Sequence, residues 1–257
     1  MRLRACCVNM NGWPTGVGRR VFDTIDSTNI YARAIVNDGA SPVWIMAHEQ
    51  TVGVGRRGRA WSTQRGNFAA TYLAEIKDDL NTVALRSFVA ALALYDALNA
   101  VGVAADRLSL KWPNDVLLDG GKVAGILLET AGVGPSHICI GIGVNLAHAP
   151  EPAKMETNAV PAKSLLADVG ININAEQFLD ALAFAYQQRE TQFRASGFDT
   201  IRTDWLTHAA RLGETIIART PKGDTVGTFE TLDETGAVIL QTAKGRCAIH
   251  AAEIFFT

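Results

Sequence analysis

Residues 48–61 have the sequence His48-Glu-Gln-Thr-Val-Gly-Val-Gly-Arg-Arg-Gly-Arg-Ala-Trp61, which combines the two features of an anion-binding loop. Its glycines let the backbone turn sharply and approach a ligand closely, and they are Gly53, Gly55 and Gly58. Its arginines carry guanidinium groups, whose paired N–H donors match phosphate and carboxylate oxygens, and they are Arg56, Arg57 and Arg59. A solvated basic turn or a nucleic-acid contact explains the same residues equally well, so a second motif is needed to decide.

The composition is that of an ordinary globular protein. The chain has 257 residues, of which 48% are hydrophobic and 19% charged, enough for one large core or a core with a small additional domain. Its formal net charge of -2 excludes the overall basic field of a dedicated nucleic-acid binder. The arginine cluster is therefore a local feature, which favours a small anionic ligand.

Cysteine usage and hydropathy indicate the compartment. Cys6, Cys7, Cys139 and Cys247 form no CxxC pair and no Cys/His spacing suited to zinc, so we expect reduced thiols. The N-terminus lacks the apolar region of a signal peptide, and no stretch approaches the ~20 apolar residues of a membrane span. The sequence predicts a cytoplasmic chain without a membrane segment.

Hydrophobic periodicity divides the chain into three parts. Residues 1–20 show no sustained period and are expected to form an N-terminal leader that packs loosely. Residues 21–210 mix strand-like and helical patterns, which predicts an α/β protein of the α+β kind. Residues 211–257 consist of short strands parted by turn signals, which predicts a small all-β domain of SH3-like size.

The individual elements follow from period and capping. Strands are expected over residues 21–25, 43–47, 67–75, 116–118, 123–130, 137–146, 214–220, 225–230, 237–242 and 247–255, with another strand and a corner over 108–115. One helix is expected to begin after Asp26-Ser-Thr-Asn29 and to end near Gly39, with Ser27 and Thr28 as caps whose hydroxyls can also face a ligand. Other helices are expected from Leu85 to about Gly102, after the capping box Asn174-Ala-Glu-Gln177, and over 199–208.

A second motif supplies a partner for the loop. It is Lys111-Trp-Pro-Asn-Asp115, followed by Lys122 and Gly125. On its own, Trp-Pro-Asn-Asp makes a good turn. Lys122 lies on a Gly-Gly hairpin within the sheet that would also carry the arginine loop, which makes a cationic pocket containing one carboxylate. Such a pocket suits a phosphate and a carboxylate bound together.

With these motifs, residues 21–257 resemble the biotin protein ligases, enzymes that attach biotin to biotin-dependent carboxylases. The four matching signals stand in the family's order: Ser27-Thr-Asn29; Gln50 with Gly53-Val-Gly-Arg-Arg-Gly-Arg59 and Trp61; Lys111-Trp-Pro-Asn-Asp115 with Lys122, Val123, Ala124 and Gly125; and Gly141-Ile-Gly-Val-Asn145. Each is short, and the four together are highly specific. The resemblance implies a mixed-sheet catalytic domain of the class II synthetase type over 21–210 and an SH3-like barrel over 211–257.

The resemblance also implies a two-step reaction with ATP and Mg²⁺. Biotin's carboxylate attacks the α-phosphate to give biotinyl-5'-AMP and pyrophosphate, and a lysine of a biotin carboxyl carrier protein then attacks the activated acyl group. Mg²⁺ is expected to arrive with ATP, and the sequence does not identify protein ligands for it. Some members carry an N-terminal helix-turn-helix, for which residues 1–20 are too short, so no DNA binding is expected. The sequence leaves a monomer and a homodimer open.

Site residues are carried over from the family motifs. The residues expected to be catalytic are Arg56, Asp115 and Lys122. Those expected to bind biotin are Ser27, Thr28, Asn29, Gln50, Gly53, Arg56, Trp61, Lys122 and Gly125. Those expected to bind ATP and the adenylate are Gly55, Arg56, Arg59, Lys111, Asn114, Asp115, Lys122, Gly141, Gly143 and Asn145. We interpret Asp115 as positioning the cationic side chains; holding Mg²⁺ and deprotonating the incoming lysine are the alternatives.

One departure and two rival interpretations accompany the resemblance. Val54 stands where many members have an arginine, so one ligand contact is missing or replaced and weaker retention of the adenylate is expected. A lipoate or octanoate ligase of the same fold class is the nearer rival, and the two motifs favour biotin over it. The other rival is a non-catalytic binding module, either a nucleic-acid binder or a biotin sensor that has lost turnover. The near-neutral net charge argues against the nucleic-acid binder, and the intact Arg56, Lys122 and Asp115 argue against the sensor.

Overall fold

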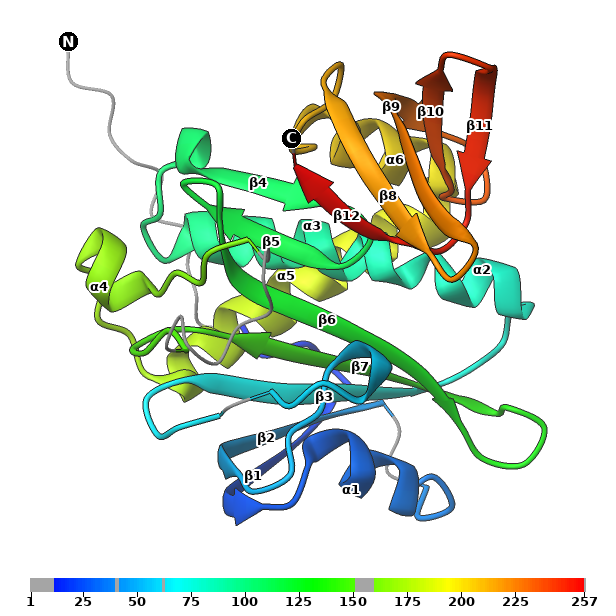
Figure 1. The fold of residues 1–257 in the computed structure, drawn as a ribbon. Coiled ribbons are helices and arrows are strands. Elements are labelled where there is room, and N and C mark those ends of the chain that lie inside the picture. The colour runs from blue at the N-terminus through cyan, green and yellow to red at the C-terminus, as the bar shows by residue number, and fades with distance from the viewer. Residues whose placement is uncertain (1–11, 40–41, 62, 151–159, 257) are drawn as a thin grey trace, which may run out of the picture.

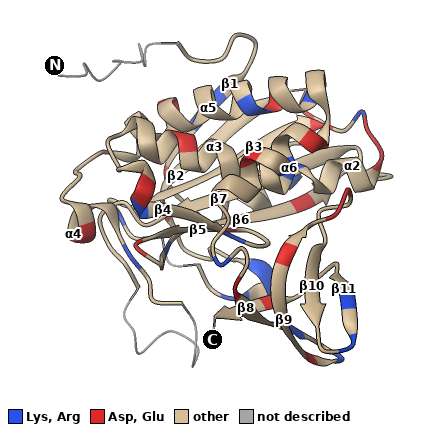
Figure 2. Cartoon of the chain, turned by 90° about the horizontal axis from the view of Figure 1, so that it is seen from above, with Lys and Arg blue, Asp and Glu red and all other residues tan. Residues whose placement is uncertain are grey.

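The computed structural model describes residues 12–39, 42–61, 63–150 and 160–256. They form a seven-stranded mixed sheet with helices on both faces and a separate five-stranded antiparallel sheet at the C-terminal end (Figure 1). The larger sheet has the order β1-β2-β3-β7-β6-β5-β4, in which β1 and β2 run parallel and the other neighbours run antiparallel. Acidic and basic residues are interspersed over both parts (Figure 2), as the small net charge requires.

The strands of the larger sheet are β1 Gly18–Ile25, β2 Val43–Gln50, β3 Phe68–Glu75, β4 Leu108–Lys111, β5 Asp115–Leu118, β6 Gly121–Ala131 and β7 His137–Val144. The smaller sheet contains β8 Thr215–Thr220, β9 Gly223–Leu232, β10 Val238–Thr242, β11 Gly245–Ile249 and β12 Glu253–Phe256. The helices are α1 Thr28–Ala34, α2 Leu80–Ala84, α3 Arg86–Ala100, α4 Leu165–Val169, α5 Ala175–Ser196 and α6 Phe198–Thr207, with short 3-10 turns η1 Arg56–Gly58 and η2 Ala105–Arg107.

The first edge of the larger sheet differs from the expectation. β1 begins at Gly18, so residues 18–20, expected in a loose leader, pair in parallel with residues 43–45 of β2. These residues are exposed or half-exposed at the sheet edge, so their sequence has no apolar alternation to indicate a strand. Residues 1–11, which include Cys6 and Cys7, lie outside the described part of the chain.

The helices follow the expected order with three differences. The first helix ends at Ala34, and residues 35–39 form turns. The five-residue helices α2 and α4 were not predicted, because little more than one turn shows no periodicity. The capping box of α5 is confirmed: the Asn174 side chain accepts from the Gln177 amide at 2.8 Å, and the Gln177 side chain accepts from the Asn174 amide at 3.5 Å.

The smaller sheet has the order β11-β10-β9-β8-β12. The single strand expected over residues 247–255 is wrong, because the chain forms β11 beside β10 and then crosses to the opposite edge, where β12 pairs with β8. One short stretch of chain thus supplies the strands at both edges of this sheet. The antiparallel strands agree with the SH3-like domain expected at this end of the chain.

Two apolar layers sandwich the larger sheet. The large core lies between the sheet and the helices α3, α5 and α6, and α3 is buried on most sides. Residues 80–100, which span α2 and α3, are long and apolar enough to cross a membrane by composition alone, yet 72% of the apolar 18-residue window within them is buried inside the protein. The smaller layer lies under α1 and includes Cys139, a free thiol whose pKa burial raises to about 11.

A buried ion pair joins α3 to α5. The Arg86 guanidinium donates to Glu190 Oε1 at 3.0 and 3.2 Å, and both side chains are only 8% exposed. Asp78 accepts from the same guanidinium at 2.7 Å, and Arg194 donates to Glu190 at 2.7 Å. Removing one partner would leave the other buried charge with only one, more exposed partner.

A contact between the two sheets reaches the glycine–arginine loop. Glu253, the first residue of β12, accepts from Arg59 at 2.7 and 2.8 Å and from Arg57 at 3.3 Å. The hydrogen bond from Arg59 contributes most to holding the pKa of Glu253 below its ordinary value. The contact is therefore complete above that ordinary value and weakens only as the pH falls through the lowered pKa. Nearby, Trp112 Nε1 donates to the Gly236 carbonyl at 2.9 Å and ties the two sheets a second time.

We expect Arg86→Met to lower the free energy of unfolding by ~3 kcal/mol or more, because a buried carboxylate loses its principal partner. Urea denaturation measures the loss as a lower midpoint at an unchanged slope. The double variant Arg86→Met/Glu190→Met should recover most of it, since neither charge remains. Arg219→Met breaks an exposed pair with Asp224 and serves as the control that unfolds like the wild type. Wild-type stability of Arg86→Met would contradict the assignment.

We expect Glu253→Gln to loosen the glycine–arginine loop, because Arg57 and Arg59 lose their shared carboxylate. The loss is worth ~1 kcal/mol for a partly exposed pair, or about fivefold faster amide exchange in the loop. Hydrogen exchange of a peptide spanning residues 53–61 measures it. Glu230→Gln, which breaks the exposed pair with Arg246, is the matched control. Equal exchange in the two variants would show that Glu253 does not restrain the loop.

Candidate active site

The glycine–arginine loop connects β2 to β3 and folds back on itself. Val54 and Ala60 form an antiparallel bridge, and the Gly55 amide donates to the Arg59 carbonyl at 2.7 Å. The tip requires left-handed backbone at residues 57 and 58, with φ of 58° and 72°, and Gly58 adopts it without a Cβ clash. Val54, the residue that departs from the family pattern, thus contributes backbone pairing that closes the loop.

The three arginines of the loop contact two different parts of the protein. Arg56 Nη1 donates to Asn114 Oδ1 at 3.0 Å, whereas Arg57 and Arg59 turn to Glu253. Burial lowers the pKa of Arg56 and nearby Asp115 opposes this shift, so the guanidinium stays charged at neutral pH. Arg59, expected at the adenylate, lies against the C-terminal sheet instead.

The Lys111–Asp115 motif brings a carboxylate between two ammonium groups. Asp115 Oδ1 lies 2.7 Å from Lys122 Nζ, and Oδ2 lies 3.9 Å from Lys111 Nζ. The register explains the closeness: Asp115 opens β5 opposite Gly125, and a bulge between residues 116 and 117 sets Leu117 opposite Lys122. Burial is the main cause that lowers the pKa of Lys111, while Asp115 counteracts it. The expected cluster of cations around one carboxylate is present.

The Trp61 indole lies against two glycine positions, one in β6 and one in β7. A Cβ built on Gly143 would overlap the Trp61 indole, and one on Gly125 would lie 3.3 Å from both Trp61 Cζ3 and Lys122 Nζ. Lys122 Nζ is 5.5 Å from the centre of the Trp61 ring, within the range of a cation–π contact. The floor of Gly143 and Gly125 thus leaves the room that the indole occupies.

A polar network lies beside this floor under α1. Gln50 Oε1 accepts from the Thr28 amide at 2.8 Å and from the Thr28 hydroxyl at 3.1 Å, and Gln50 Nε2 donates to Thr63 at 3.0 Å. The Thr71 hydroxyl lies 2.8 Å from that of Thr28 and also contacts Asn29, whose amide donates to Glu129 at 2.7 Å.

Ser27 and Thr28 differ from simple caps. Ser27 has the extended backbone of an N-cap residue, but within the described chain its side chain makes no capping bond. The Gln50 side chain satisfies the Thr28 amide at the start of α1 in its place. Ser27 and Thr28 are each 3% exposed, so both hydroxyls are buried beside the glycine floor.

Gly141, Gly143 and Asn145 do not form one surface. The Cβ-free side of Gly141 is filled by Asn29, and that of Gly143 by Trp61, so these glycines adjoin the residues expected to bind biotin. Asn145 lies beyond them, where its Nδ2 donates to the Lys163 carbonyl at 3.0 Å. The glycines were expected against the adenylate; a protein side chain, and not open space, lies against each of them.

Sequence reasoning missed several residues of the site, namely Thr63, Thr71, Glu129 and Lys163. Thr71 carries a usable signal, because it is a polar residue at the centre of an apolar strand and is fully buried. The other three lie in segments without a motif, and only the folded chain brings them to the site.

A groove of about 680 Å³ lies on the other side of the sheet, at the start of α5. Its charged lining residues are Arg19, His48, Glu176 and Asp180. Arg19 already pairs with both acidic residues, at 3.1 and 2.7 Å. Ligand sites commonly lie in large hollows, but the arginine of this groove is already paired. We therefore assign the active site to the cluster around Lys122, where the cations converge on one carboxylate.

Two protein-family models match this chain. The model of the biotin/lipoate A/B protein ligase family matches residues 21–145, and that of the biotin protein ligase C-terminal domain matches residues 212–257. A biotin–[acetyl-CoA-carboxylase] ligase of Paracoccus denitrificans is 48% identical over 233 residues, which are 90% of this chain and 97% of that protein. The bifunctional ligase/repressor BirA of Bacillus subtilis is 30% identical over 90% of this chain and 72% of its own length.

Solved structures agree on the fold. Biotin protein ligase from Aquifex aeolicus, in complex with biotin and ATP, superposes with a TM-score of 0.80 at 24% identity, over 92% of this chain and 97% of that one. The first family match begins in β1 and ends at Asn145, so it contains all four motifs, and the second covers β8 to β12. With nearly half of its aligned residues identical to a relative that it covers almost completely, this chain belongs to the biotin protein ligase family.

Proposed function

We propose that this chain activates biotin with ATP and transfers the biotinyl group to a lysine of a biotin carboxyl carrier protein. The supporting observation is the Asp115–Lys122 pair at 2.7 Å, with Arg56 close by and Trp61 on the glycine floor beneath. Two cations that surround one carboxylate suit a reaction in which a second carboxylate meets a phosphate. The Paracoccus relative, 48% identical, carries the name of this activity.

Biotin recognition is assigned to the network under α1. The ureido ring offers two N–H donors and one carbonyl acceptor, so its site needs acceptors and a donor in a dry place. The buried hydroxyls of Ser27 and Thr28 and the amide of Gln50 supply them. Trp61 covers the apolar part of the ligand beside Gly143 and Gly125.

In the first step, a biotin carboxylate oxygen attacks the α-phosphorus of ATP and the bond to pyrophosphate breaks. Negative charge increases on the phosphoryl oxygens, and Lys122 and Arg56 are the cations placed to stabilise it. Removing one preorganised donor of this type typically costs ~3 to 4 kcal/mol of transition-state stabilisation. The arginine needs no pKa adjustment, because its guanidinium stays charged throughout.

In the second step, the carrier's lysine nitrogen attacks the acyl carbon, and AMP leaves with the electron pair of the broken bond. The amine must first lose a proton, since its ordinary pKa of ~10.4 leaves little neutral form at pH 7. Asp115 is already engaged by Lys122 and Lys111, so we assign it to positioning these ammonium groups. A positioning role predicts that both steps depend on it.

Mg²⁺ enters the proposal as part of the substrate MgATP. Among the described residues there is no group of three His, Cys, Asp or Glu side chains that could hold a metal ion. Mg²⁺ would therefore take its ligands from the phosphates and water. A cytoplasmic location, the absence of DNA and membrane partners, and the choice between monomer and homodimer remain predictions.

A lipoate or octanoate ligase is the second candidate, because one family model covers biotin and lipoate ligases together. The two acids differ at the ring, since biotin carries a ureido group and lipoate has no such hydrogen-bonding group. These buried groups already bond one another, and the ureido group can add hydrogen bonds to them that an apolar ring cannot, so they favour biotin.

We expect biotin-dependent ATP–pyrophosphate exchange with the purified protein, and little with lipoate or octanoate. Lys122→Ala should reduce the exchange at least a hundredfold, because it removes a cation from the transition state. Lys222→Ala, in the exposed turn before β9, is the control for charge. Exchange with lipoate alone would move the assignment to the second candidate, and silence with all three acids would indicate a binding module.

The same assay tests the assignment of Asp115. Asp115→Asn should slow both adenylation and transfer, because Lys122 and Lys111 lose their shared partner. Single-turnover transfer of preformed biotinyl-5'-AMP to a carrier domain measures the second step separately. Normal adenylation with failed transfer would contradict the positioning role and favour proton removal from the incoming lysine.

We expect Gly143→Ala to weaken biotin binding, because the added Cβ would displace the Trp61 indole. A shift of the indole by about 1 Å is expected to cost tenfold or more in affinity. Calorimetric titration with biotin measures it, and Gly12→Ala, whose Cβ would meet nothing within 4 Å, is the control for folding. Unchanged affinity in Gly143→Ala would separate Trp61 from the biotin pocket.

A further inference from the structure

The segment 160–165, which we name the strap, runs along the start of β6. The Lys122 amide donates to the Pro161 carbonyl at 2.6 Å, and the Lys163 amide donates to the Lys122 carbonyl at 2.9 Å. Both backbone polar groups of Lys122 are therefore bonded to the strap. Because the backbone sets where a side chain begins, the strap sets the origin of the Lys122 side chain.

The strap also holds Asn145. Asn145 Nδ2 donates to the Lys163 carbonyl at 3.0 Å, and the Leu165 amide donates to the Asn145 carbonyl at 3.1 Å. The amide of Asn145 donates in turn to Val123 of β6 at 2.9 Å. Two residues assigned to ATP, from different strands, thus share one support.

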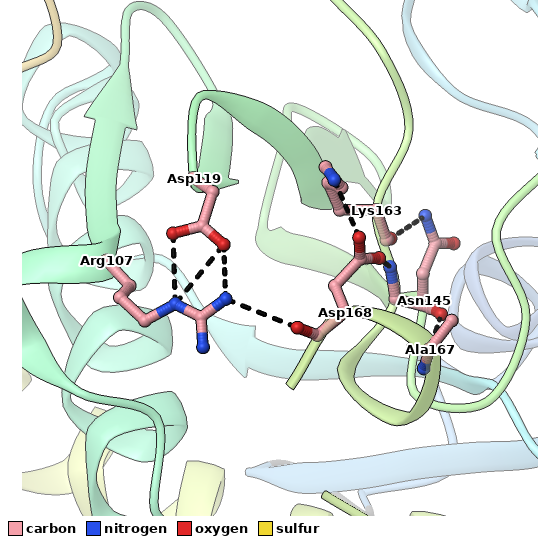
Figure 3. A network of polar contacts seen from close by, with 7 residues as sticks. Arg107, Asp119, Asn145, Lys163, Ala167 and Asp168 are labelled. Carbon is pink, nitrogen blue, oxygen red and sulfur yellow. Dashed lines mark hydrogen bonds and ion pairs between the residues drawn. The ribbon is translucent and has the colours of Figure 1, made fainter. Parts of the chain in front are cut away.

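Asp168 of α4 holds the strap through two of its residues, Lys163 and Ser164 (Figure 3). Its Oδ1 lies 2.6 Å from Lys163 Nζ, and its Oδ2 accepts from the Ser164 amide at 2.8 Å. Arg107, paired with Asp119, donates to the Asp168 carbonyl at 3.2 Å and ties α4 to the η2 turn. The carboxylate therefore bonds both a side chain and a backbone group of the strap.

Packing and charge make this support rigid. A Cβ on Gly121 would overlap the Lys163 side chain and lie 3.0 Å from the Pro161 carbonyl, so this glycine lets the strap lie close against β6. Burial raises the pKa of Asp168, but the bonds from Lys163 and the Ser164 amide outweigh it and hold the pKa below its ordinary value. The Asp168 carboxylate is thus ionised at neutral pH, and hydrogen bonds to a charged acceptor are the stronger ones.

We propose that Asp168 is a positioning residue for the adenylation step, acting through the strap on Lys122 and Asn145. This inference rests on the proposed function and deepens it. The contacts of the biotin network described above come from α1, β2, β3 and β6 and involve no strap residue. Lys122 is also expected to contact biotin, but as one contact among several, so loss of Asp168 should affect ATP and the rate of adenylation far more than biotin binding.

The test compares Asp168→Asn with Lys163→Met, which keeps the stem over Gly121 and removes the charge. Each should lower kcat/KM for ATP in biotin-dependent pyrophosphate exchange about tenfold, because a displacement well under 1 Å is enough for such a loss. The dissociation constant for biotin should change less than twofold. The double variant should be no worse than either single one, since both remove the same ion pair.

Two further measurements make the test specific. Asp224→Asn breaks an exposed pair with Arg219 in the C-terminal sheet and is the matched control, with wild-type kinetics expected. Hydrogen exchange at the amides of Lys122 and Lys163 should be faster in Asp168→Asn than in the wild type. This readout does not depend on activity.

The outcomes separate the two claims. Unchanged ATP kinetics in both variants, or equal losses for biotin and ATP with a lower melting temperature, would overturn the positioning role. If the wild type itself catalyses no exchange, the proposed function fails, and the amide exchange then decides the inference. Unaltered protection of Lys122 in Asp168→Asn would overturn it, and faster exchange would support the mechanical link from Asp168 to Lys122.

Discussion

The site depends on one constraint, which is that the middle of the larger sheet has glycine at three neighbouring positions on one face. Gly141 and Gly143 of β7 stand beside Gly125 of β6, and each is covered by a side chain from elsewhere. Asn29 arrives from α1 and Trp61 from the glycine–arginine loop. A sheet normally separates its two faces with a layer of side chains. Here the backbone itself is the floor, so residues far apart in sequence lie on it together.

Three carboxylates near the site each pair with one or two cationic side chains. Asp115 engages two lysines, Glu253 engages two arginines, and Asp168 engages Lys163. Each carboxylate fixes a cation that would otherwise be a mobile chain with several rotamers. The entropy of ordering these groups is thus lost on folding and not when a ligand binds, which is how preorganised sites gain their electrostatic advantage.

The sequence predicted the main parts of the fold because apolar period and capping are local signals, as at Asn174, where the box formed as expected. It was wrong over residues 247–255, since a mainly apolar stretch without Gly or Pro does not show that it serves two edges of one sheet. By family likeness it assigned the motif residues to one site, and the structure brings Lys111, Asp115 and Lys122 together while Asn145 bonds to Lys163. It could not assign Arg59 to Glu253, nor the glycine faces to Asn29 and Trp61, because those contacts arise only from tertiary packing.

The bond from Trp112 to the Gly236 carbonyl limits how this protein can diversify. Trp112 stands inside the Lys111–Asp115 motif, between residues that face the reaction, yet its indole reaches the neighbouring sheet. A C-terminal sheet transplanted from a relative would have to present a carbonyl at that point and a carboxylate at the place of Glu253. The two units are therefore expected to have been inherited as a matched set, and recombination between distant ligases should be tolerated elsewhere along the chain before it is tolerated at their boundary.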